Sequence, residues 1–190
     1  HKVMAGSNSS ITGVYFGGVD PKTHEYYVYM ETFGGGSGAR FNKDGLSCVQ
    51  VHMTNTSNLP IESMEIEFPY MVEQYTLVRD SGGPGKFRGG LSMRKDIRVL
   101  GHDSQFTIKA DRQKTPPWGL FGGRPGLPGV ITIYPGTEQE AVIDSKKSGT
   151  TLKANGVLRC QMPGAGGYGD PMERDRALIV HDLEEGYITP

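Results

Sequence analysis

Glycine is concentrated in clusters that separate short runs of alternating apolar and polar residues. The chain of 190 residues holds 28 glycines, about twice the usual share. The clusters read GGGSG, SGGPG, FRGG, FGGRPG and PGAGGYG. Glycine and proline between such runs are typical of hairpins and loops. Their placement predicts short strands joined by glycine-rich loops.

The runs between the clusters have the period of two that half-buried strands show. In residues 91–99, apolar Leu91, Met93, Ile97 and Val99 alternate with polar side chains. Residues 105–110 alternate in the same way. Aromatic and β-branched content favours further strands within residues 25–31, 75–78, 130–134 and 156–162.

Helix signals are few. Ile61, Met64 and Phe68 would share one helical face, so we expect a short helix that begins near Pro60 and runs into a strand. Residues 182–186 are a second, weaker helix candidate. The sequence therefore predicts a mainly β fold of antiparallel sheets, sandwich or barrel-like, with glycine-rich loops and one or two short helices. We expect one domain over residues 1–190, with a loop-rich segment at 112–129.

Composition excludes several classes of protein. A net charge of −1 argues against a general nucleic-acid binder, which needs a positive excess. No apolar run reaches the roughly 18 residues of a membrane-spanning helix, and the first residues have no signal-peptide pattern. Cys48 and Cys160 have no metal-ligand or redox spacing, so we expect a reducing, cytoplasmic compartment. Both ends look cut, which indicates part of a longer polypeptide.

The stretch DSGGPGKFRGG, residues 80–90, resembles neither of two catalytic loops. Phe87 stands where a phosphate-binding P-loop needs Ser or Thr after Lys86, and Ser81 lacks the glycine of a nucleophile elbow. Its glycines favour a turn between two strands. An anion-binding nest with Lys86 or Arg88 is the alternative.

Three other stretches are candidates for function. Residues 31–45 place three successive glycines between Glu31 and Arg40, which favours either an anion or substrate loop or a flexible hairpin. Residues 51–62 gather polar groups that could orient a substrate or a hard metal ion, or cap a helix. Residues 110–126 hold the single Trp, which fits a partner surface or the core. The histidines are too scattered for a complete metal site.

Taken in order, five motifs resemble the B-type subunits of the hydantoinase/5-oxoprolinase family, whose relatives include lactamases and acetone and acetophenone carboxylases. The motifs cover nearly the whole chain and read ETFGGGSGAR, DGLSCVQVHMTNTSNLPIESME, SGGPGKFRGG, DRQKTPPWGLFGG and PGAGGYGDP. The resemblance implies a C-terminal portion of a longer B-type subunit that works in a hetero-oligomer.

The resemblance also implies a reaction. An A-type hydantoinase partner takes up ATP and phosphorylates the amide oxygen of a cyclic amide, and the B-type subunit hydrolyses the activated intermediate. The family's metal ligands lie in the N-terminal half, so a divalent metal is expected there and none in these residues. The isolated chain is expected to be inactive.

Polar density, rather than a matched catalytic motif, places eight residues nearest a shared cavity. Arg40 and the amides of Gly35 and Gly36 would bind an anion, and His52 or Glu62 would assist proton transfer. The remaining substrate-binding candidates are Glu31, Asn55 and Asn58. Two alternatives stay open: part of an ATP-dependent carboxylase, and a non-catalytic scaffold that docks the partner.

Overall fold

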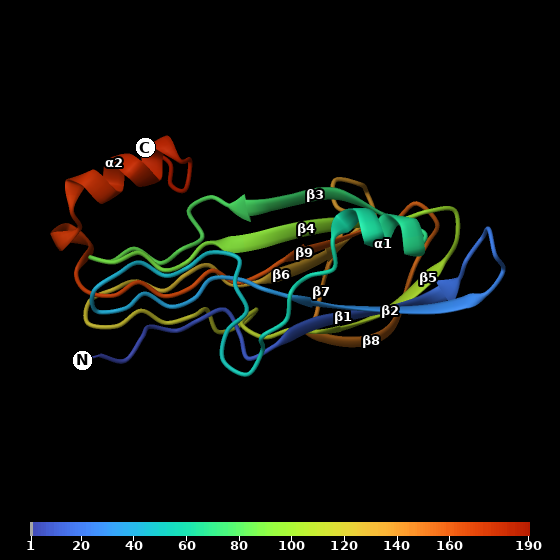
Figure 1. The fold of residues 1–190 in the computed structure, drawn as a ribbon, viewed down its shortest axis with the longest axis horizontal. Coiled ribbons are helices and arrows are strands. Elements are labelled where there is room, and N and C mark those ends of the chain that lie inside the picture. The colour runs from blue at the N-terminus through green and yellow to red at the C-terminus, as the bar shows by residue number, and fades with distance from the viewer. Residues whose placement is uncertain (1) are drawn as a thin grey trace.

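The computed structural model describes residues 2–190 and consists mainly of two antiparallel sheets (Figure 1). In spatial order, the first sheet contains β2 (Tyr26–Phe33), β1 (Thr12–Val19), β5 (Ser104–Lys109) and β8 (Lys146–Leu152). The second contains β3 (Tyr70–Val78), β4 (Ser92–Val99), β9 (Val157–Gln161), β6 (Val130–Ile133) and β7 (Ala141–Ile143). The mainly β prediction is confirmed, and neither sheet closes into a barrel.

The core lies between the two sheets because both send apolar side chains inward. Phe16 of β1 packs against Tyr70 of β3, with ring centroids 5.0 Å apart, and against Phe106 of β5 at 6.3 Å. Met93, Ile97 and Val99 of β4 are fully buried in the same cluster, as their alternation predicted. The arrangement is a sandwich.

Both predicted helices are present. Helix α1 (Ile61–Glu67) follows Pro60, and Phe68 ends it in an extended conformation two residues before β3 begins. Helix α2 (Arg176–Glu184) includes the start of the predicted 182–186 segment. A short 3-10 helix, η1 (Pro171–Glu173), precedes α2. Within residues 2–190, neither α-helix is long and apolar enough to cross a bilayer.

The strands that the sequence did not reveal are β1, β7 and β8. Strand β1 contains glycine at three of its eight positions and lacks a clean alternation. Strand β8 reads KKSGTTL and is exposed except at its end, where Leu152 is its single apolar residue, so no apolar alternation marks it. Both belong to the first sheet, where pairing with β5 fixes them.

The other half of the molecule is a bundle of extended, glycine-rich segments that run side by side, with α2 next to them (Figure 1). Backbone hydrogen bonds join neighbouring segments, such as Ala39 N–H to the Gly166 carbonyl at 3.0 Å. A Cβ on Gly166 would stand 1.8 Å from the Trp118 carbonyl oxygen, and one on Gly36 would stand 2.2 Å from that of Gly90. Only glycine lets these backbones approach so closely, as at the crowded axis of collagen.

Residues 80–90 connect β3 to β4, which pair antiparallel, so this stretch does return one strand to its neighbour. It does so by a long excursion through the glycine-rich bundle rather than by a tight turn. Gly83 N–H donates to the Ala165 carbonyl at 2.7 Å, and Gly89 N–H to that of Gly83 at 2.9 Å. These amide groups are therefore used within the bundle.

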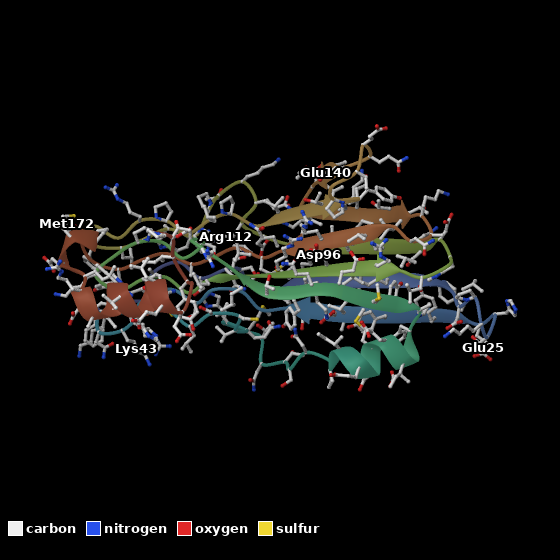
Figure 2. All side chains as sticks on the ribbon, turned by 90° about the horizontal axis from the view of Figure 1, so that it is seen from above. Glu25, Lys43, Asp96, Arg112, Glu140 and Met172 are labelled. Carbon is white, nitrogen blue, oxygen red and sulfur yellow. The ribbon has the colours of Figure 1, made fainter. Side chains whose placement is uncertain are left out.

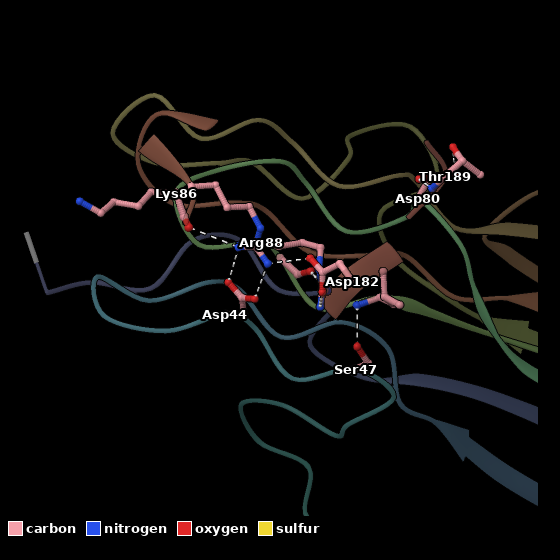
Figure 3. A network of polar contacts seen from close by, with 10 residues as sticks. Asp44, Ser47, Asp80, Lys86, Arg88, Asp182 and Thr189 are labelled. Atoms are coloured by element: carbon pink, nitrogen blue, oxygen red, sulfur yellow. Dashed lines mark hydrogen bonds and ion pairs between the residues drawn. The ribbon is translucent and has the colours of Figure 1, made fainter. Parts of the chain in front are cut away.

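A buried ionic network fastens α2 to the end of the bundle (Figure 3). Arg88 donates two hydrogen bonds to the Asp182 carboxylate, at 3.0 and 3.1 Å. Arg174 bridges Asp182 and Asp44, with N–O distances of 2.6 to 2.8 Å. Lys86 pairs with Glu173 at 3.1 Å. Of the two cations considered for an anion nest, Arg88 is therefore neutralised by a buried carboxylate, whereas Lys86 forms an exposed ion pair with Glu173.

Candidate functional site

An open pocket of about 570 Å³ lies between strand β2, the segment before α1 and the end of α1. Strand β2 is at the edge of its sheet, so its free side faces the pocket. The lining residues are Val28, Tyr29, Met30, Glu31, Thr32, Thr56, Ser57, Asn58, Leu59, Pro60, Glu67 and Phe68.

An ion pair between Glu31 and Lys95 lies beside this pocket and links the two sheets. The Lys95 Nζ donates to both carboxylate oxygens, at 2.7 and 2.9 Å, and the two side chains are only 3% and 1% exposed. Nζ also lies 3.9 Å from the Met64 sulfur and 5.5 Å from the centre of the Tyr75 ring. In a buried pair of this kind, each charge stabilises the other in the absence of water.

Tyr29 places a buried hydroxyl next to the Glu31 carboxylate. The side chain is 5% exposed and lines the pocket, and its hydroxyl has no partner among residues 2–190. Burial raises the pKa of this hydroxyl, and the negative charge of Glu31 adds to the rise. The group therefore stays protonated and can donate to a bound molecule.

Asn58, which lines the pocket, is hydrogen-bonded to Tyr75 beside it. The Asn58 Nδ2 donates to the Tyr75 hydroxyl at 2.9 Å, and the Cys48 sulfur lies 3.7 Å from the same oxygen. Burial, the largest cause, and the neighbouring Cys48 raise the pKa of Tyr75. With its side-chain nitrogen fixed by Tyr75, Asn58 presents an amide oxygen that can accept a hydrogen bond.

The structure brings together two of the eight predicted site residues, Glu31 and Asn58, at this pocket. His52, Asn55 and Glu62 are exposed nearby in the sequence but do not line it. His52 has a left-handed backbone, with φ of 59°.

The three residues predicted to bind an anion lie elsewhere. The N–H groups of Gly35 and Gly36 donate to the carbonyls of Val49 and Pro163, at 3.1 and 3.3 Å. Arg40 is exposed and pairs through its backbone with Lys43, which lies in the glycine-rich half (Figure 2). Both glycines contribute to backbone packing in the bundle.

Sequence reasoning missed Lys95, Tyr29 and Tyr75. Lys95 has a signal: the apolar series Leu91, Met93, Ile97 and Val99 skips one inward position, and that position is Lys95. A lysine that faces a core needs a buried partner. Tyr29 and Tyr75 look like ordinary strand residues, so no local pattern distinguishes them.

No group of three or more His, Cys, Asp or Glu side chains in the described part of the chain could hold a metal ion. The bundle also offers no phosphate cradle where Gly35, Gly36, Gly83 and Gly89 lie, because their N–H groups bind backbone carbonyls. The polar groups at the pocket are carboxylates, an amide and hydroxyls, which suit a small polar organic molecule.

Comparisons with known proteins give a consistent family. The sequence profile described as Hydantoinase B/oxoprolinase matches residues 1–171. A provisionally named D-/L-hydantoinase B-type subunit from Pseudomonas sp. (strain NS671) is 34% identical over the whole chain, which covers 31% of that protein. The beta subunit of the caprolactamase from Pseudomonas jessenii is 30% identical over 94% of this chain, which covers 32% of that protein.

The crystal structure of the ATP-dependent caprolactamase from Pseudomonas jessenii has the same fold, with a TM-score of 0.75 at 22% identity. The match covers 98% of this chain and 34% of that one. The chain thus spans about a third of the length of these relatives. On the family profile and these identities, it belongs to the Hydantoinase B/oxoprolinase family.

Proposed function

We propose that this chain forms one wall of the hydrolytic cavity in the B-type subunit of an ATP-dependent cyclic-amide hydrolase. The observation that carries the proposal is an open pocket lined by Tyr29, Glu31 and Asn58, where the Tyr29 hydroxyl is buried without a hydrogen-bond partner among residues 2–190 and Glu31 is paired with Lys95. Buried polar groups without partners are rare in proteins and are often completed by a ligand. The hydrolase names among the relatives at 30% identity or more support this reaction class.

The chemistry of a cyclic amide fits these groups. A ring amide presents one carbonyl acceptor and one N–H donor, and Tyr29 and Asn58 offer the complementary donor and acceptor. Ring opening by water is difficult because the amide is stable. ATP, bound by an A-type partner, would supply a phosphoryl group that activates the amide oxygen. The residues of this chain would then bind and orient the activated ring and exclude bulk water.

Glu31 is suited to positioning a proton or an attacking water, because Lys95 holds its carboxylate in one orientation. Among the other predicted residues, Asn55 would orient the substrate and His52 or Glu62 would assist proton transfer. Arg40 would attract an anionic group. None of these four lines the pocket, so Glu31 and Asn58 are the first to test.

We favour the hydrolase over a carboxylase because relatives at 30% identity or more carry hydrolase names. Acetone carboxylase shares the fold, with a TM-score of 0.72, but only 19% of its residues are identical over the match. By contrast, the 5-oxoprolinase of Dictyostelium discoideum is 35% identical over 74% of this chain, which covers 11% of that protein.

The assembled enzyme with its partner tests the proposal, with 5-oxoproline, hydantoin and caprolactam supplied in turn with ATP. Asn58→Ala should lower turnover at least about tenfold, the effect of one lost substrate hydrogen bond. Asn42→Ala is the matched control, because Asn42 is exposed and lies outside the pocket. Equal turnover in both variants would remove the pocket from the reaction.

A further inference from the structure

A second pocket, of about 400 Å³, is unlike the first in its charge. It is formed by the segment that follows β5, by Ser10 and by the start of β8, and Figure 2 labels Arg112, one of its residues. The lining consists of Ser10, Asp111, Arg112, Gln113, Lys114, Thr115, Ser145 and Lys146. Three cations thus face a single carboxylate, and three hydroxyl side chains accompany them.

The single carboxylate does not neutralise this pocket. Asp111 accepts a hydrogen bond from the Ser10 hydroxyl at 3.0 Å and lies 3.5 Å from the Lys146 Nζ. Lys114 is exposed and has no ion pair or hydrogen bond within the described residues. Two positive charges therefore remain without a partner.

Arg112 is held in place with its hydrogen-bond donors free. Its guanidinium lies 4.4 Å from the centre of the Trp118 ring, and it forms no side-chain hydrogen bond with the rest of the described chain. The backbone is left-handed, with φ of 62°, and the Arg112 carbonyl accepts from Gly129 N–H at 3.1 Å. A strained backbone at a non-glycine residue is typical of functional sites.

Gln113, which also lines the pocket, adds a further donor without a partner. Its side-chain nitrogen is shielded from solvent and has no partner among residues 2–190. An amide nitrogen, a guanidinium fork and two ammonium groups all donate hydrogen bonds and none accepts them. Such a set recognises an oxyanion.

We propose that this pocket binds the phosphoryl group of a small phosphorylated molecule. A phosphate monoester carries a charge of about −1.5 to −2 at pH 7 and three acceptor oxygens, which matches two unpaired cations and the free donors. An arginine fork pairs with two phosphate oxygens at once. The site stands independently of the cyclic-amide reaction at the first pocket.

Calorimetric titration of the 190-residue protein with inorganic phosphate and with methyl phosphate tests the site. Arg112→Gln should weaken binding of both roughly tenfold, the value of one charge-assisted hydrogen bond pair. Lys114→Met and Lys146→Met should each weaken it about threefold, since both side chains are exposed. Lys114 is exposed and forms no hydrogen bond or ion pair within residues 2–190, so its replacement should leave folding intact.

Lys147→Met is the matched control, because it removes the same charge one residue from Lys146 and outside the pocket. The affinity of this variant for phosphate should stay within about twofold of that of the parent protein, because salt screens a charge that lies outside the pocket. Three results would overturn the proposal: no phosphate binding at tens of millimolar, equal weakening by Lys147→Met, or acetate binding as tight as phosphate. The titration needs no enzyme turnover, so its outcome is separate from the fate of the proposed hydrolase.

Discussion

At the scale of the residue, the Glu31–Lys95 pair is the most demanding feature of the molecule. Both charges are almost completely removed from water and depend on each other. Taking a charge out of water costs several kcal/mol, and a close partner offsets that cost. The pair therefore fixes β2 of one sheet against β4 of the other beside the candidate pocket.

Replacing one residue of this pair should lower the stability of the fold far more than replacing both. Lys95→Met leaves a buried carboxylate alone and should lower the free energy of unfolding by about 3–5 kcal/mol. The double variant Glu31→Gln with Lys95→Met should recover most of that loss. Urea unfolding followed by circular dichroism measures both. Additive losses in the double variant would show that the two side chains do not interact.

The sequence allowed part of this site to be predicted. Glu31 and Asn58 were found because polar side chains are dense around them, and Lys95 could have been found from its place in an apolar series. Tyr29 could not, because whether a buried hydroxyl has a partner depends on chain segments that meet from distant parts of the sequence.

At the scale of the element, the glycine-rich bundle has the strictest sequence requirement. Neighbouring segments are in direct backbone contact. At Gly36 and Gly166, an added methyl group would therefore overlap a carbonyl oxygen of the next segment. Gly36→Ala and Gly166→Ala should each destabilise the protein by about 3 kcal/mol or more, the range for overpacking and backbone displacement.

Gly13→Ala provides the comparison, because a Cβ there meets its nearest atom at 3.5 Å, an ordinary contact. This change should alter the melting temperature little. A melting temperature for Gly36→Ala equal to that of Gly13→Ala would mean that the segments are not closely packed.

The ion pairs that hold α2 against the bundle predict that the stability of this helix depends on pH. Burial raises the pKa of Asp182, but the hydrogen bonds and charges of Arg88 and Arg174 outweigh it, so the net pKa lies below the ordinary 3.8. The stability from Asp182 is complete above that value and is lost as pH falls through the lower folded pKa.

Hydrogen exchange of α2 amides, followed from about pH 5 down to about pH 2, should show faster opening on acidification. In Asp182→Asn, the helix should exchange rapidly at every pH, because no carboxylate remains to titrate at that position. A pH dependence of α2 exchange that is unchanged in Asp182→Asn would contradict this assignment.

The elements were predicted to different degrees for physical reasons. Strands with inward apolar and outward polar residues were visible, and so was α1 after its proline. Strand β8 was not, because its exposed polar residues are ordered by the pairing with β5. The bundle was interpreted only as loops, since extended glycine segments gain their order from neighbours far along the chain.

At the scale of the whole molecule, the chain provides a sandwich with a pocket at its edge and a rigid bundle beyond. It covers about a third of the length of the hydantoinase and caprolactamase subunits that it resembles, and the pocket on it is open. An open pocket is consistent with a larger cavity whose other side is formed by further polypeptide. We therefore expect the 190-residue chain alone to hydrolyse no cyclic amide.

The number of product molecules released per ATP hydrolysed is the most direct test of the central claim, measured in the assembled enzyme carrying Tyr29→Phe. The change removes only an unpartnered hydroxyl, so folding should be unaffected. If this pocket receives the activated amide, ATP consumption should continue while product per ATP falls several-fold. A ratio equal to that of the parent enzyme, with the variant folded and assembled, would contradict the claim.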